Sequence, residues 1–222
     1  MIPEKIGCNF DMDGVLFLSS EIHYQAYCEA LAAEPVEVLD YRELSGMRTD
    51  SAIQKIFNKS GIVLNPEKLQ ELVSRKRGFA SEMLRKQPPV ATDCNKVIAE
   101  FYRRGIPMAL ASSSSSQNVQ LFLESSGTRN FFSVILSGDD VKNAKPDPEI
   151  FRIARTCFGI LPEFCFVIED SESGIRSAQA DGMKVIGVVA QHTQKELKLF
   201  GTVATISRLD ELLKLSLFQS NI

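Results

Sequence analysis

The second half of the chain repeats one pattern, in which a stretch with helical periodicity is followed by a short apolar run. The clearest run is Ile106–Ala111, which leads into a tract of serines. Short apolar strands that alternate with helices are typical of a parallel sheet covered by helices on both faces. We therefore predict an α/β fold. The other predicted strands of this half are Val134–Leu136, Phe164–Ile168 and Val185–Val189, and a last helix is predicted over 208–217.

One further apolar run, Ile6–Phe10, stands alone near the start of the chain. It is followed by helical patterns, with no convincing strand before the second half. This lone strand must join the later sheet, because the helical block offers it nothing to pair with. We therefore predict a catalytic core of residues 1–15 and 89–222, with an all-helical cap domain, residues 16–88, inserted just past the first strand.

The composition excludes several classes of protein. A net charge of −3 argues against a protein that neutralises nucleic-acid phosphates. No apolar run has the length of a membrane span or of a signal peptide. The five cysteines are scattered and form no C-x-x-C pair, so they indicate neither a disulfide framework nor a zinc site. We expect a cytoplasmic monomer with no nucleic-acid or membrane partner.

Two pairs of acidic residues come directly after predicted strands. Asp11 and Asp13 follow the first strand, and Glu169 and Asp170 follow the strand that ends at Ile168. Either pair alone also fits a structural role, because Asp-Gly sequences form turns and acids cap helices. Since the carboxyl ends of parallel strands meet at one edge, these carboxylates should crowd together and repel one another. A divalent cation would offset this repulsion, and oxygen ligands favour Mg²⁺.

Hydroxyl and ammonium groups are expected at the same edge. Ser112 and Ser113 follow Ile106–Ala111 and precede a helical pattern, and Lys145 lies in a loop that two prolines stiffen. A serine tract is often a flexible linker and most lysines are solvated, so each feature alone also has an ordinary explanation. Together, the hydroxyls, the helix-start amides and the lysine predict a pocket for a phosphoryl group.

These groups favour phosphoryl transfer that uses a side chain as the nucleophile. The chain has no G-x-x-x-x-G-K-[ST] sequence, so a bound nucleotide is not expected. An aspartate can form an aspartyl-phosphate, which divides one difficult displacement into two easier ones. The second aspartate, two residues later, would protonate the leaving oxygen and then activate water.

Four motifs of the sequence resemble those of the haloacid dehalogenase superfamily, in its branch of phosphatases and phosphomutases with a helical cap. The motifs are FDMDGV, ALASSS, Lys145 within NAKPDPEIF, and VIEDSESGI. The resemblance implies a Rossmann-like core, Asp11 as the nucleophile and Asp13 as the general acid and base. It also implies that Asp11, the carbonyl of Asp13 and Asp170 hold Mg²⁺, with Glu169 as a ligand or a partner of the ligands. Ser112 and the Ser113 amide would hold the phosphoryl oxygens. Lys145 would neutralise charge between the nucleophile and the phosphate.

Within this superfamily the chain is similar to β-phosphoglucomutase and to sugar-phosphate phosphatases. The resemblance implies a hinge histidine at His23 and basic groups of the cap, Arg48 and Lys76, for the distal end of a small phosphorylated metabolite. Leu18 departs from the pattern, because an aspartate is frequent there.

Three functions are compatible with these motifs. A phosphatase and a mutase share every catalytic residue and differ in whether water or a sugar hydroxyl attacks the aspartyl-phosphate. We favour a Mg²⁺-dependent phosphatase, since it is the broader outcome and Leu18 weakens the resemblance to the mutase. A catalytically silent binding protein is the third alternative, and the loss of Asp11 or Asp13 would be its signature.

Overall fold

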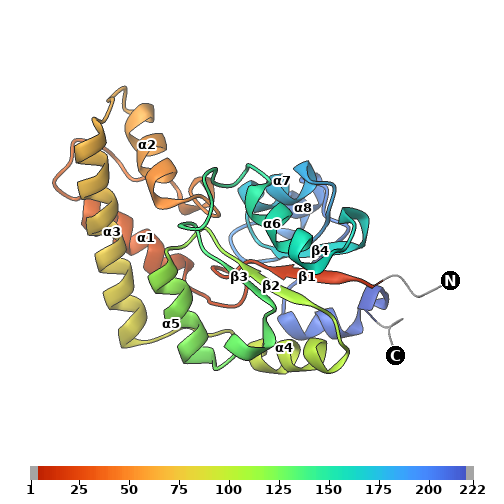
Figure 1. The fold of residues 1–222 in the computed structure, drawn as a ribbon. Coiled ribbons are helices and arrows are strands. Elements are labelled where there is room, and N and C mark those ends of the chain that lie inside the picture. Colours follow the sequence, from red (N-terminus) through yellow and green to blue (C-terminus); the bar gives the residue numbers. More distant parts are fainter. Residues whose placement is uncertain (1–4, 219–222) are drawn as a thin grey trace.

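The computed structural model describes residues 5–218. Its core is a six-stranded sheet in which all neighbouring strands are parallel, in the order β3-β2-β1-β4-β5-β6 (Figure 1). The predicted α/β fold is confirmed. The strands are β1 (Gly7–Phe10), β2 (Met108–Ala111), β3 (Val134–Leu136), β4 (Cys165–Glu169), β5 (Lys184–Val188) and β6 (Ala204–Ile206).

β1 lies in the middle of the sheet, although its neighbours are far away in the sequence. Cys8 pairs with Met108 of β2 on one side and with Phe166 of β4 on the other. All four residues of β1 are buried, because helices cover both faces of the sheet. The prediction that the first strand joins the later sheet is confirmed.

Helices cover both faces of the sheet (Figure 1). Phe10 of β1 packs against Phe101 on one face, with their ring centroids 5.9 Å apart. On the other face, Val167 of β4 belongs to a second apolar cluster with Phe151 and Ile175. Within residues 5–218 no helix is both long and apolar enough to cross a membrane. The first face carries α4 (Cys94–Arg103) and α5 (Ser116–Ser126), and the second carries α6 (Glu149–Phe158), α7 (Glu172–Ala180) and α8 (Gln194–Leu199).

The C-terminal part of the chain differs from the prediction in two ways. β6 was not predicted, because three residues at a sheet edge are too few to show a period. The helix predicted over 208–217 is wrong, since this stretch forms the 3₁₀ helices η4 (Leu209–Lys214) and η5 (Ser216–Phe218). With three residues per turn, Leu209 and Leu212 fall on one side of η4, where both are buried.

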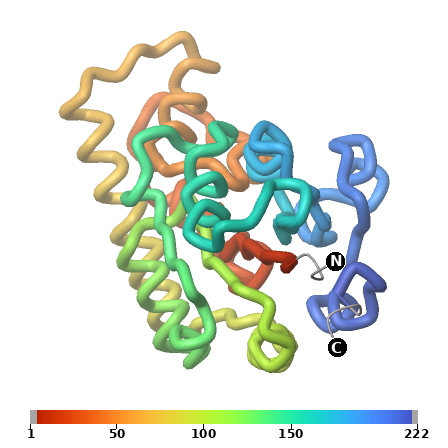
Figure 2. Tube along the Cα trace, turned by 45° about the vertical axis from the view of Figure 1, so that its right-hand side comes forward, coloured from red at the N-terminus to blue at the C-terminus, as the bar shows by residue number. Residues whose placement is uncertain are grey.

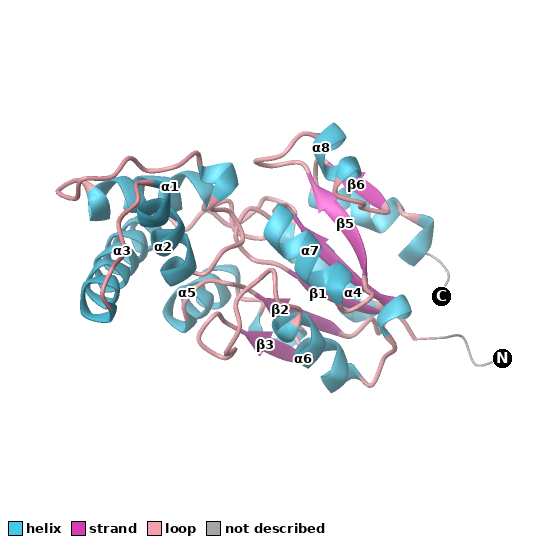
Figure 3. Cartoon of the chain, turned by 90° about the horizontal axis from the view of Figure 1, so that it is seen from above, coloured by secondary structure: helices cyan, strands magenta, loops and turns pink. Residues whose placement is uncertain are grey.

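A second group of helices lies beside the sheet rather than on its faces (Figures 2 and 3). They have an apolar cluster of their own, in which Tyr27, Ile53 and Leu72 are buried. No strand forms between residues 18 and 88, as expected. We call residues 16–88 the helical insertion, and its limits as a separate domain stay a prediction. Its helices are α1 (Ser20–Leu31), α2 (Thr49–Lys59) and α3 (Pro66–Lys86), with the 3₁₀ turn η1 (Tyr41–Glu43).

Two adjacent linkers connect the helical insertion to the core. The Leu18 amide donates a hydrogen bond to the Pro89 carbonyl at 2.7 Å, and the Ala91 amide donates to the Leu16 carbonyl at 2.9 Å. Phe17 and Val90 form an antiparallel bridge between these two bonds. The insertion therefore leaves and re-enters the core at one place.

Candidate active site

Two neighbouring strands bring three carboxylates into one buried cluster. Asp11 follows β1, Glu169 ends β4 and Asp170 follows it. One oxygen of each carboxylate lies within 4.8 Å of the others, and all three residues are buried. The fold thus brings together acids that are far apart in the sequence, at the edge where the sequence predicts them.

Lys145 neutralises part of this cluster from the loop that follows β3. Its Nζ donates hydrogen bonds to Asp11 Oδ1 at 2.6 Å, to Glu169 Oε1 at 2.8 Å and to the Ala111 carbonyl at 3.2 Å. Burial lowers the pKa of Lys145, but the attraction of the Asp11 and Glu169 carboxylates outweighs burial and raises it above its usual value. Burial raises the pKa of Asp11, against the attraction of Lys145. Lys145 therefore stays charged next to the predicted nucleophile.

Glu169 and Asp170 differ in how many partners their oxygens have. Oε1 of Glu169 contacts Lys145, and Oε2 accepts hydrogen bonds from the amides of Asp170 and Ser171 and from the Ser171 hydroxyl, each at 2.9 Å. Oδ2 of Asp170 is buried and has no partner among the described residues. It faces Gly14, where any Cβ would collide with it. Because a buried carboxylate oxygen needs a partner, this arrangement fits a cation held by Asp170, with Glu169 orienting its neighbours.

Asp13 belongs to a separate network of hydrogen bonds. Its Oδ2 accepts from the hydroxyls of Ser114 at 2.6 Å and Ser112 at 3.4 Å, and its Oδ1 contacts the Ser19 hydroxyl and His23 Nε2, the latter at 3.0 Å. Burial raises the pKa of Asp13, but the attraction of His23 and the hydrogen bonds from His23, Ser114 and Ser19 outweigh burial and lower it. Asp13 is therefore ionised in this arrangement.

The helical insertion extends this network with a buried lysine. Lys76 Nζ lies 2.9 Å from His23 Nδ1 and 4.4 Å from the centre of the Tyr27 ring. Because the Asp13 carboxylate accepts hydrogen bonds, His23 donates to it from Nε2 and accepts from Lys76 at Nδ1. Burial lowers the pKa of Lys76 to about 7, and burial together with the charge of Lys76 lowers the pKa of His23. Asp13, His23 and Lys76 thus form one chain of hydrogen bonds.

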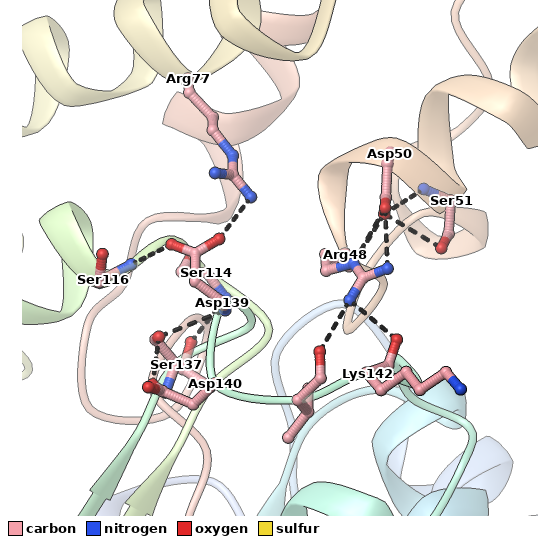
Figure 4. Close-up of polar contacts among 12 residues, drawn as sticks. Arg48, Asp50, Ser51, Arg77, Ser114, Ser116, Ser137, Asp139, Asp140 and Lys142 are labelled. Atoms are coloured by element: carbon pink, nitrogen blue, oxygen red, sulfur yellow. Dashed lines mark hydrogen bonds and ion pairs between the residues drawn. The ribbon is translucent and has the colours of Figure 1, made fainter. Parts of the chain in front are cut away.

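The structure puts the other predicted residues at the contact between insertion and core. The Ser113 hydroxyl donates to the Gly46 carbonyl at 2.7 Å. Arg48 pairs with Asp50 at 2.8 Å and donates to the Val141 carbonyl at 3.2 Å, so it faces a core loop rather than Asp13 (Figure 4). Of the three basic or hinge residues predicted for the insertion, His23 and Lys76 line the pocket above Asp13 and Arg48 does not.

Two groups of this network were not predicted as site residues. The hydroxyls of Ser19 and Ser114 both donate hydrogen bonds to Asp13. A tract of five serines gives no sign of which hydroxyl faces inward, because neighbouring residues in an irregular segment follow no fixed period. Ser114 could have been found only from its position relative to Asp13.

The pocket above the two aspartates is small. Its walls combine Asp11 and Asp13 with Tyr41, Gly46 and Lys76 of the insertion, and its volume is about 30 Å³. This is the room of about one water molecule. A larger groove of about 520 Å³ contains none of the predicted site residues; its walls include Arg42, Lys55, Arg176 and His192.

The haloacid dehalogenase-like hydrolase family matches residues 9–188, which is most of the chain. The chain belongs to this family. The family predicted from FDMDGV, ALASSS, NAKPDPEIF and VIEDSESGI is therefore confirmed. In this haloacid dehalogenase-like hydrolase, those four segments are the ones that meet at the carboxyl edge of the sheet.

Relatives of this haloacid dehalogenase-like hydrolase include phosphatases. It is 31% identical to the phosphorylated carbohydrates phosphatase of Thermotoga maritima, over 89% of this chain and 92% of that protein. It is 28% identical to the chloroplastic 5-amino-6-(5-phospho-D-ribitylamino)uracil phosphatase of Arabidopsis thaliana, over 94% of this chain but only 57% of that protein.

A solved structure supports the fold. The β-phosphoglucomutase of Clostridium difficile superposes with a TM-score of 0.83, over 98% of this chain and 96% of that chain, at 20% identity. Identity this low supports the fold of the haloacid dehalogenase-like hydrolase and not its substrate.

Proposed function

We propose that the protein is a Mg²⁺-dependent phosphatase that hydrolyses small phosphomonoesters, in particular sugar phosphates, through an aspartyl-phosphate at Asp11. The observation that carries this proposal is the separation of the two aspartates. Asp11 is held by Lys145 at 2.6 Å, whereas Asp13, two residues later, contacts only hydroxyls and His23. Two carboxylates in such different surroundings suit a nucleophile and a proton carrier. The phosphatase relatives support the same reaction.

The ion would be held by Asp11, by the carbonyl of Asp13 and by Asp170, whose unpartnered oxygen fits a cation. When bound, Mg²⁺ would neutralise the crowded carboxylates and the phosphoryl oxygens. Glu169 would position its neighbours, because its own oxygens are already engaged.

In the first step, Asp11 attacks the phosphorus atom and the bond to the leaving oxygen breaks. Lys145, beside Asp11, offsets the charge of the phosphoryl group. Asp13 is ionised in this structure, so it must first take up the proton that it would deliver to the leaving oxygen. A phosphomonoester has its second pKa at about 6 and carries this proton in part of its population at neutral pH.

In the second step, water attacks the phosphorus atom of the group on Asp11, and the bond between phosphorus and the Asp11 oxygen breaks. The ionised Asp13 accepts a proton from the water, and phosphate leaves. The hydroxyls of Ser112 and Ser114 and the ring of His23 hold Asp13 in the form that a base needs. A pocket of about 30 Å³ admits a water molecule but no sugar phosphate. We infer that the helical insertion opens about the paired linkers to admit the substrate and closes for the reaction.

The test is a panel of phosphomonoesters that includes sugar 1-phosphates, incubated with Mg²⁺ while inorganic phosphate and isomerised sugar phosphate are both measured. We expect phosphate release that Asp11→Asn abolishes, and Asp210→Asn, whose carboxylate pairs with Arg208 and contacts no predicted site residue, serves as the matched control. Isomerised product without phosphate release would show that the protein is a mutase and not a phosphatase. No turnover of any substrate, with Asp11→Asn equal to wild type, would refute both enzymes and favour the binding protein.

A small phosphorylated metabolite is the proposed partner, and the cytoplasmic location and the monomeric state stay predictions. Native mass spectrometry of the full chain would test the monomer.

A further inference from the structure

The helical insertion contacts the core through a loop that also serves the active site. We call residues 137–148, between β3 and α6, the β3–α6 loop. Arg77 of α3 donates from Nη2 to Asp139 Oδ1 at 3.0 Å, and Arg48 donates to the carbonyls of Val141 at 3.2 Å and Lys142 at 3.4 Å (Figure 4). Two arginines of the insertion therefore bind one short stretch of the core.

Asp139 is fixed in place from the core side. Its second carboxylate oxygen accepts a hydrogen bond from the Ser116 amide at 2.9 Å, at the first turn of α5. Ser115, at the cap position of α5, makes no side-chain capping bond, so Asp139 takes that role. Burial raises the pKa of Asp139, but the Ser116 amide and Arg77 outweigh burial and lower it. The core thus presents an ionised, oriented carboxylate to the insertion.

Both partners of this ion pair adjoin catalytic groups. Arg77 follows Lys76, which contacts His23, and Asp139 lies on the loop that carries Lys145 to Asp11. Successive residues of a helix point about 100° apart, so Lys76 faces the pocket while Arg77 faces the loop. The ion pair therefore links the segment that supplies Lys76 to the segment that supplies Lys145.

The exposure of the pair fits a contact that forms and breaks. The side chains of Arg77 and Asp139 keep 30% and 36% of their surface exposed. Ion pairs this accessible are weak, typically below about 1 kcal/mol, and salt screens them. Such a contact favours closure without making the closed form permanent.

Building on the proposed function, we propose that the Arg77–Asp139 ion pair is a latch that holds the helical insertion closed over Asp11 and Asp13. Arg77 and Asp139 are positioning residues, because they act through Lys76 and through closure and touch no reacting atom. The latch sets how often the pocket opens and, with it, how Lys76 is held against His23.

The test measures opening directly, by hydrogen exchange of the full chain without substrate. Arg77→Met removes the charge but keeps the apolar stem, and Asp139→Asn keeps an acceptor for the Ser116 amide. We expect the amides of residues that line the pocket to exchange about two- to five-fold faster in each variant; these are Leu44, Gly46, Met47, Thr49, Ser113 and Ser114. Amides of β4 should be unchanged, and Arg77→Lys should restore protection. Lys86→Met, which breaks an ion pair inside α3, is the matched control.

Two further measurements separate a latch from general stabilisation. The double variant Arg77→Met with Asp139→Asn should exchange no faster than the more affected single variant, because both remove one interaction. High salt should speed exchange in wild type and leave the double variant unchanged. Unchanged exchange in both single variants, or additive effects in the double variant, would overturn the latch. Exchange requires no turnover, so a failed phosphatase assay would leave this result standing.

Discussion

The two aspartates near the start of the chain belong to halves of the site that are built differently. The half around Asp11 comes from the core alone, since Glu169 ends β4, Asp170 follows it and Lys145 lies in the loop after β3. The half around Asp13 is shared, because Ser19, His23 and Lys76 belong to the helical insertion. The contacts of Asp11, the predicted nucleophile, therefore do not depend on the position of the insertion, whereas those of Asp13, the predicted proton carrier, need the insertion in the place it has here.

The largest effect on stability is expected in the core half. Lys145→Met would leave Asp11 and Glu169 buried without their cation, which should cost about 3–5 kcal/mol of unfolding free energy. Urea unfolding of the full chain measures this loss, with the exposed Lys195→Met as the control. A loss no larger than that of the control would show that the core half does not depend on Lys145.

Within the core half, Asp170 and Glu169 should differ in how much each contributes to Mg²⁺ affinity. Asp170→Asn should reduce Mg²⁺ affinity by more than 100-fold, because it removes the carboxylate with the unpartnered oxygen. Glu169→Gln should reduce it by about 10- to 100-fold, as expected for a residue that orients the ligands. Titration calorimetry without substrate measures both. Equal losses would make Glu169 a direct ligand and contradict the difference between the two acids.

The shared half should make stability depend on pH through Lys76. Burial lowers the pKa of Lys76 from its ordinary 10.5 to about 7. Between these values the unfolded chain binds more protons than the folded chain, so stability should rise with pH, by up to about 1.4 kcal/mol per unit. The Lys76→Met variant should lack this rise in urea unfolding at pH 7, 8 and 9. A constant difference between variant and wild type over this range would show that Lys76 is not held in a buried, uncharged form.

The sequence predicts the core half better than the shared half, and the reason is geometric. Asp11, Lys145 and Asp170 could be grouped because each follows a strand, and parallel strands carry their following residues to one edge. The meeting of Ser19, His23 and Lys76 depends on how a helical block lies against a sheet, and no period in the sequence encodes that. The position of Arg48 was beyond prediction for the same reason, and Ser114 was missed because an irregular serine tract follows no fixed period. β6 and the C-terminal 3₁₀ helices were missed because short or tightly wound segments give weak periodicity.

The paired linkers at Phe17 and Val90 have a consequence for how this chain can be altered. Because they are hydrogen-bonded side by side, the two ends of the helical insertion lie about as far apart as adjacent strands, roughly 5 Å. A foreign domain whose own termini are equally close could be grafted at this site without stretching the sheet. The junction is thus a suitable place to exchange the helical insertion for another domain, with the residues around Asp11 left unchanged.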